Sequence, residues 1–209
     1  MIYAVVIKFI AIFSNRYKMS QRGILIAVEG LNCSGKTSQC VKLNNVLKNL
    51  GHDVEVVTIP MPLLTVNDRQ CHLMYAQNVW QEQDDMKKKL LMGKSLIVDS
   101  YMYTSMCSKV SGVCDIAWLR SLYIQCLMPD LSVYLDTSVD EVMRRGCTAS
   151  DVLLKCKMFK DMIWADINDG HWKVINGNDT KGTVHASLLR YALETLYSIR
   201  PEQPLYEIM

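Results

Sequence analysis

The segment Gly30-Leu-Asn-Cys-Ser-Gly-Lys36-Thr37 fits the phosphate-binding pattern G-x-x-x-x-G-K-S/T at every fixed position. In such a loop the glycines let backbone N–H groups turn toward a phosphate chain, and the N-terminus of the following helix adds partial positive charge. The lysine reaches the β- and γ-phosphates of a nucleotide, while the next hydroxyl holds Mg²⁺. The pattern therefore predicts a site for a nucleoside triphosphate centred on Lys36 and Thr37.

A missing motif indicates which nucleotide is the donor. Guanine-binding proteins carry N-K-x-D, whereas this chain reads Asn176-Gly-Asn-Asp179, so we expect ATP. Two predicted strands end in an aspartate, Asp99 and Asp136, and either carboxylate can assist Mg²⁺. The expected donor contacts come from the loop and the start of the next helix: Gly30, Asn32, Cys33, Ser34, Gly35, Lys36, Thr37 and Ser38.

The elements on either side of the loop suit this role. The apolar run from Gly23 to Glu29 is typical of a strand buried on both faces of a parallel sheet. After the loop, apolar residues recur at helical spacing up to Leu50, where Gly51 can end the helix. A strand before the loop and a helix after it are the context in which the pattern binds phosphate.

Strands and helices alternate along the rest of the chain. Strands are predicted at 53–60, 95–99, 131–136 and 172–175, and helices at 68–92, from 115, and at 139–145, 151–164 and 184–197. In the helix at 68–92 the residues expected to face the core are Leu73, Val79, Trp80, Met86 and Leu90. This alternation predicts an α/β domain with a parallel sheet covered by helices on both faces.

Composition narrows the class of protein. The 209 residues carry 23 basic and 21 acidic side chains, and this near balance argues against a nucleic-acid groove. Half the residues are hydrophobic, which excludes a disordered chain. The eight cysteines show no C-x-x-C spacing and the histidines are scattered, so we expect reduced thiols in the cytoplasm and no zinc site.

The first 18 residues differ from the rest. Residues 1–13 are apolar except for Lys8, and as a helix they would reach about 20 Å, short of a bilayer core of about 30 Å. Basic residues precede the apolar run of a signal peptide, but here they fall inside or after it. We therefore expect residues 1–18 to be an extension without a membrane partner, and residues 19–209 to form one domain. A short membrane-associating tail is the alternative.

A series of segments, in order, resembles the thymidylate kinase family in its eukaryotic and poxviral form. The likeness covers about residues 22–209. Gly35–Gln39 resembles G-K-S/T-T-Q, His72–Trp80 resembles H-L-L-F-x-A-N-R-W, and Leu96–Tyr101 resembles V-D-R-Y. The remaining matches are Arg22–Gly30 to the opening strand, Pro129–Leu135 to P-D-L-x-x-x-L, Arg145-Gly146 to R-G, and Pro204–Met209 to the ending P-L-G-E-L-W-x.

The resemblance implies a fold and a reaction. The fold is a P-loop doubly wound sheet of five parallel strands in the order 2-3-1-4-5, and the reaction is ATP-dependent phosphorylation of dTMP to dTDP. In that order the third strand lies beside the first, so Asp99 rather than Asp136 is expected on the Mg²⁺ side, opposite Thr37. Arg145 is expected to lie against adenine. With Lys36 and Mg²⁺ it is also expected to neutralise the charge of the transferred phosphoryl group, and Arg144 is a further candidate for that second role. The resemblance also implies a homodimer.

On the acceptor side the resemblance implies that Tyr75 stacks on the base and that Ser100 and Tyr101 contact the substrate. Here the chain departs from the family, because its three acceptor arginines are Pro62, Val79 and Ser100 in this sequence. Each such hydrogen bond contributes about 1.5–3 kcal/mol, and micromolar binding amounts to about 8 kcal/mol. Ordinary dTMP affinity therefore needs replacement cations, for which the candidates by position are Arg69, Lys109 and Arg120.

Two alternatives follow from the missing arginines. A deoxynucleoside kinase has a neutral hydroxyl acceptor and needs a carboxylate base, for which Glu29 is the only residue close to the loop. An ATP-binding pseudokinase would keep the donor loop without a working acceptor site. A monophosphate acceptor needs no base, because its second pKa is about 6.

Overall fold

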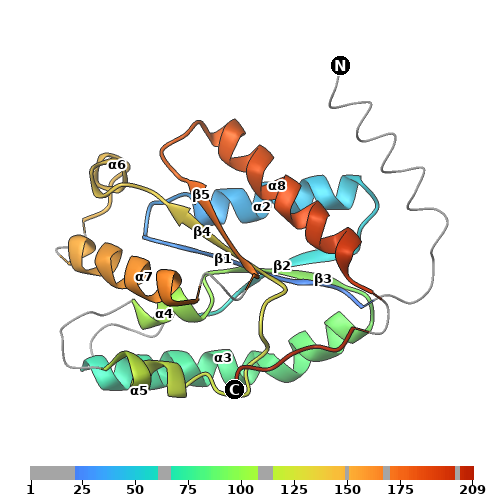
Figure 1. Cartoon of the computed structure of the whole chain (residues 1–209), viewed down its shortest axis with the longest axis horizontal. Coiled ribbons are helices and arrows are strands. Elements are labelled where there is room, and N and C mark those ends of the chain that lie inside the picture. Colours follow the sequence, from blue (N-terminus) through green and yellow to red (C-terminus); the bar gives the residue numbers. More distant parts are fainter. Residues whose placement is uncertain (1–21, 61–66, 108–114, 149–150, 167–169, 201–202) are drawn as a thin grey trace.

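The structure is a computed structural model that describes residues 22–60, 67–107, 115–148, 151–166, 170–200 and 203–209. Its strands are β1 (Leu25–Gly30), β2 (Val54–Thr58), β3 (Ser95–Asp99), β4 (Leu131–Asp136) and β5 (Trp172–Asn176). Its helices are α2 (Lys36–Asn49), α3 (Asp68–Leu91), α4 (Met102–Met106), α5 (Ile116–Ser121), α6 (Val139–Arg144), α7 (Val152–Asp166) and α8 (Lys181–Ser198). The alternation of strands and helices is as predicted (Figure 1).

The strands form one parallel five-stranded sheet in the order β2-β3-β1-β4-β5, which confirms the expected topology. The central strands β1 and β3 are buried along their whole length, as their continuous apolar sequences require. Because the strands are parallel, the loops that follow β1, β3 and β4 meet at one edge of the sheet.

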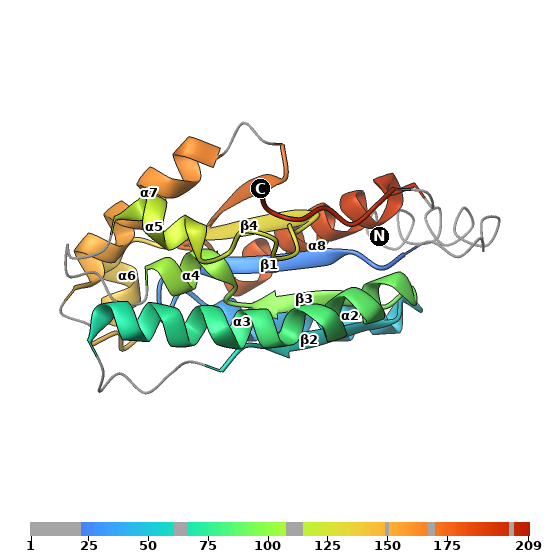
Figure 2. The ribbon, with the colours of Figure 1, turned by 90° about the horizontal axis from the view of Figure 1, so that it is seen from below.

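Helices cover both faces of the sheet. Helices α2 and α8 pack on one face, and α3, α4, α5 and α7 lie on the other (Figures 1 and 2). Side chains of β1 alternate between the two cores: Ile26 and Val28 belong to the α2–α8 cluster, while Leu25 and Ala27 belong to the cluster under α3. This doubly wound arrangement buries the strand that leads into the phosphate-binding loop.

The helix α3 differs from the sequence prediction on one flank. Val79, Met86 and Leu90 are buried as expected, but Leu73 is 50% exposed and Trp80 is 42% exposed. The Trp80 indole N–H donates to the carbonyl of Leu122 at 3.0 Å. The ring thus lies at the rim of the α3–α5 contact, because periodicity gives the apolar side of a helix but not how much of that side its neighbours cover.

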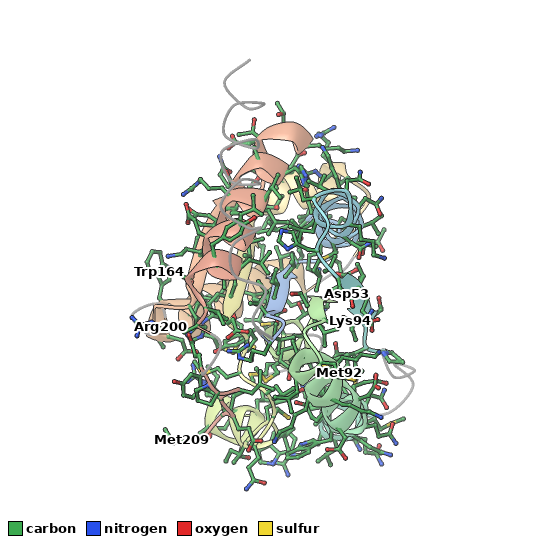
Figure 3. All side chains as sticks on the ribbon, turned by 90° about the vertical axis from the view of Figure 1, so that its right-hand side faces the viewer. Asp53, Met92, Lys94, Trp164, Arg200 and Met209 are labelled. Atoms are coloured by element: carbon green, nitrogen blue, oxygen red, sulfur yellow. The ribbon has the colours of Figure 1, made fainter. Side chains whose placement is uncertain are left out.

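The two ends of the described chain are held together beside β4. Arg22 pairs with Asp130 at 2.6 Å and donates to the carbonyl of Gln203 at 3.0 Å. The C-terminal tail then forms an antiparallel bridge between Leu127 and Glu207, and Glu207 also pairs with Lys87 of α3 at 2.9 Å. At the start of β2 and β3, Asp53 and Lys94 pair at 2.9 Å (Figure 3).

Over the described residues, every helix falls short of the length and apolar character that crossing a membrane demands.

Candidate active site

The loop between β1 and α2 has the conformation that its glycines permit. Gly30 has φ +149° and Gly35 has φ +102°, and Cys33 is left-handed at φ +63° although it is not glycine. A Cβ on Gly30 would lie 3.0 Å from Ser34 Oγ and 3.1 Å from the carbonyl oxygen of Leu135. The backbone therefore turns tightly over the end of β1 and leads directly into the first residue of α2, Lys36.

Lys36 is the buried cation of this loop. Its side chain is 7% exposed, and its Nζ donates to the carbonyl oxygens of Gly30 at 2.8 Å and Leu31 at 2.9 Å. Burial lowers the pKa of Lys36, while the nearby carboxylates of Asp99 and Glu29 act in the opposite direction. A charged amine held this way is poised to exchange carbonyl partners for phosphate oxygens.

A cavity of about 520 Å³ opens above the loop. Of the predicted site residues, it is lined by Asn32, Cys33, Gly35, Lys36, Thr37, Ser38, Tyr75, Asp99, Ser100 and Arg145. Gly30 and Ser34 contribute backbone carbonyls that hold Lys36 and Arg145. Three further residues line the cavity without having been predicted: Thr58, Ile59 and Thr104. They lie at the end of β2 and in the short helix α4, and none belongs to a recognisable motif.

The two residues expected to hold Mg²⁺ share this cavity. Asp99 ends β3, next to β1, and Thr37 lies in the first turn of α2. Asp136 instead pairs with Lys160 at 3.2 Å and does not line the cavity. Within the described ranges no three His, Cys, Asp or Glu side chains form a group that could hold a metal ion.

Arg145 is fixed beside the loop by three acceptors. Its guanidinium donates to the carbonyls of Ser34 at 3.0 Å and Gly177 at 2.9 Å, and to Glu141 Oε1 at 2.7 Å. These three hydrogen bonds hold the planar guanidinium group where Arg145 lines the cavity. Arg144 is exposed, pairs with Glu141 at 2.7 Å and does not line the cavity. The hydrogen bond from Arg144, followed by that from Arg145, lowers the pKa of Glu141 to about 2.

Three lining residues from α3, from the residue after β3 and from α4, namely Tyr75, Ser100 and Thr104, form what we call the acceptor wall. The Tyr75 hydroxyl donates to the carbonyl of Ser100 at 3.2 Å, and Ser100 is left-handed at φ +70°. Tyr101 is not part of this wall. Its ring is fully buried and its hydroxyl donates to the carbonyl of Leu127 at 3.0 Å, because the turn at Ser100 directs the next side chain into the core.

Glu29 lies beneath the acceptor wall and is 1% exposed. One carboxylate oxygen accepts the backbone N–H of Tyr103 at 3.1 Å, and the other accepts the backbone N–H of Thr104 at 2.9 Å and the Thr104 hydroxyl. Burial raises the pKa of Glu29. Both oxygens are thus engaged by α4, so the carboxylate that a deoxynucleoside kinase would need as a base is occupied.

Two of the candidate replacement cations, Arg69 and Arg120, do not line the cavity. Arg69 lies with its guanidinium 6.0 Å from the ring centroid of Trp118, and Arg120 pairs with Asp166 at 2.8 Å. Lys109 and Pro62 fall outside the described residues. Among the described residues that line the cavity, the cations are Lys36 and Arg145, and both lie on the donor side.

The fold and the loop define the class of protein. A buried parallel strand, a glycine loop and a helix that begins at a buried lysine make this a P-loop nucleotide-binding α/β protein. The thymidylate kinase family model matches residues 28–188. The chain belongs to the thymidylate kinase family.

Individual relatives agree with this assignment. A thymidylate kinase of Arabidopsis thaliana is 30% identical over 200 residues, which cover 88% of this chain and 76% of the relative. A thymidylate kinase of Danio rerio is 26% identical, with 90% and 98% covered. The solved structure of thymidylate kinase from Candida albicans has the same fold, with a TM-score of 0.76 at 21% identity over 91% of this chain and all of that chain.

Proposed function

We propose that this protein transfers the γ-phosphoryl group of ATP to dTMP and releases dTDP and ADP. The observation that carries the proposal is one cavity with a complete phosphate-binding loop on one side and an acceptor wall on the other, in a chain of this family. The relatives named above carry the name of this activity.

The chemistry needs charge neutralisation more than proton transfer. A phosphate oxygen of dTMP attacks the γ-phosphorus, and the bond from that phosphorus to the β–γ bridging oxygen breaks. No base is required, because the acceptor phosphate is already largely ionised near neutral pH. Lys36 would neutralise the transferred group after leaving the carbonyls of Gly30 and Leu31. Mg²⁺, held through Thr37 and Asp99, would supply further positive charge between the phosphates.

The acceptor wall supports recognition by neutral groups. Tyr75, Ser100 and Thr104 offer an aromatic ring, a backbone turn and hydroxyls, but no positive charge. We therefore expect weak dTMP binding, in the millimolar range, unless Arg69, Arg120 or Lys109 moves toward the acceptor phosphate.

An acceptor screen tests the proposal. Steady-state ADP release is measured with ATP·Mg²⁺ and each common mononucleotide or nucleoside, and dTMP is expected to stimulate it most. Stimulation by thymidine instead would favour the deoxynucleoside kinase, and release that no acceptor alters would favour the pseudokinase. A low-micromolar KM for dTMP, unaffected by alanine at Arg69, Lys109 and Arg120, would contradict a neutral acceptor wall.

We also propose a cytoplasmic location and a homodimer. All cysteines that the structure describes are free thiols, which suits a reducing compartment, and the dimer is what the family resemblance implies. Sedimentation equilibrium would test the dimer, and a monomer at micromolar concentration would contradict it.

A further inference from the structure

The turn from Asp99 to Thr104 has a backbone that its own sequence does not favour. Ser100 is left-handed at φ +70°, a conformation that carries an energetic cost for any residue other than glycine. Such a residue keeps this conformation only when its surroundings hold it there. The segment from Asp99 to Thr104 runs from the last residue of β3 through Ser100 into α4, and both Asp99 and Thr104 line the cavity.

Two buried side chains hold the turn from different elements. Tyr75, on α3, donates its hydroxyl to the Ser100 carbonyl at 3.2 Å. Glu29, on β1, accepts the N–H groups of Tyr103 and Thr104 at the start of α4. Tyr75 is 0% exposed and Glu29 is 1% exposed, so water does not compete for these bonds.

The Tyr75 hydroxyl is not accounted for by stacking on a base. The family motif that this segment resembles has phenylalanine at this position and arginine where Ser100 lies, so the hydroxyl and the serine are both departures. Burial raises the pKa of Tyr75, which keeps the hydroxyl protonated and therefore a donor. The Thr104 hydroxyl donates a hydrogen bond to Glu29, so toward any other partner its oxygen can only accept.

We propose that Tyr75 and Glu29 are positioning residues that hold Ser100 in its left-handed conformation and the start of α4 in place, and so set the acceptor wall. This inference rests on the proposed function, because the acceptor wall is taken to bind dTMP. Neither residue contributes charge to the reacting phosphates; each acts through the backbone of the turn.

The test compares Tyr75→Phe with Tyr123→Phe. Tyr123 is equally buried and its hydroxyl pairs with Ser105 Oγ, beyond the turn, so the two variants lose the same group at different places. Tyr75→Phe is expected to raise the KM for dTMP about fivefold, the factor for one net hydrogen bond of about 1 kcal/mol, and to leave the KM for ATP unchanged. Tyr123→Phe is expected to change thermal stability without changing either KM.

Hydrogen exchange of the backbone amides provides a second readout that needs no turnover. Exchange at residues 100–104 is expected to be about fivefold faster in Tyr75→Phe and unchanged there in Tyr123→Phe. Glu29→Gln replaces one acceptor oxygen with an NH₂ group, which cannot accept a hydrogen bond from a backbone N–H. This variant is therefore expected to accelerate exchange of the same amides more strongly. Unchanged exchange at these residues in Tyr75→Phe would overturn the inference. If the wild-type protein does not turn over dTMP, the proposed function is wrong. The exchange measurement would still decide whether Tyr75 and Glu29 hold the turn.

Discussion

The donor side and the acceptor side of the cavity are built from different kinds of contact. On the donor side, a continuous stretch from Gly30 to Ser38 supplies backbone groups, a buried lysine and a helix N-terminus, and one further residue, Arg145, comes from the end of α6. On the acceptor side, Tyr75 and Ser100 come from α3 and from the turn after β3, and Glu29 beneath them comes from β1. A site local in sequence depends on a fixed motif, whereas one assembled from distant segments can change residue types while the fold is kept.

The largest effect is expected on the donor side. Lys36→Ala should lower kcat at least about a hundredfold, because one preorganised cation for the transferred phosphoryl group is lost. Wild-type protein should also gain about 2.7 kcal/mol of stability at ATP concentrations a hundred times the Kd, as measured by thermal shift. Lys42→Ala, an exposed lysine on the same helix, is the control. Equal ATP stabilisation of wild type and Lys36→Ala would show that the loop is not the donor site.

Arg145→Ala should change the KM for ATP and not the KM for dTMP, which is the reverse of the effect expected for Tyr75→Phe. Removing the guanidinium that bridges the carbonyls of Ser34 and Gly177 should raise the KM for ATP about tenfold, the value of one charge-assisted hydrogen bond, and leave the KM for dTMP unchanged. Steady-state kinetics with each substrate varied would measure both constants. Arg144→Ala should match wild type, since Arg144 does not line the cavity. An equal rise in both KM values would mean that the two sides are not independent.

A smaller effect concerns pH and stability. Burial lowers the pKa of Lys36 in the folded protein below 10.5, so between the two pKa values the unfolded chain binds more protons. Stability should therefore rise with pH in this window in wild type but not in Lys36→Met. Urea unfolding at a series of pH values from 7 to 10 would measure the difference between the two proteins. If the stabilities of the two proteins depended on pH in the same way, the pKa of Lys36 would not be lowered in the folded protein.

The smallest effect is expected at the N-terminus. We propose that residues 1–18 lie outside the domain, because the family match begins at residue 28. A chain that starts at Met19 should keep the thermal stability and ATP binding of the full chain within error. Failure of the shorter chain to fold would assign the first 18 residues a structural role.

Sequence patterns predicted the loop and its flanking elements, but not the contacts that hold the acceptor wall, for a physical reason. Strands, the glycine loop and the helix after it are encoded by neighbouring residues. The observed bounds of β3 and β4 therefore equal the predicted ones, and Lys36 begins the helix after the loop. The five-residue helix α4 has no periodicity to detect, and it was missed. The buried position of Tyr101 and the role of Glu29 depend on contacts between segments more than 15 residues apart, which no local pattern contains.

The strand order also has a consequence for how the chain is made. Leu25 pairs with Leu96 and Ile26 pairs with Leu131, so the partners of β1 follow it by about 70 and about 105 residues. At 5–20 residues per second, a ribosome needs roughly 5–20 s after β1 to complete β4. During that time β1 lacks the neighbours that bury it in the finished sheet. The strand at the centre of the sheet therefore depends on protection from aggregation during synthesis.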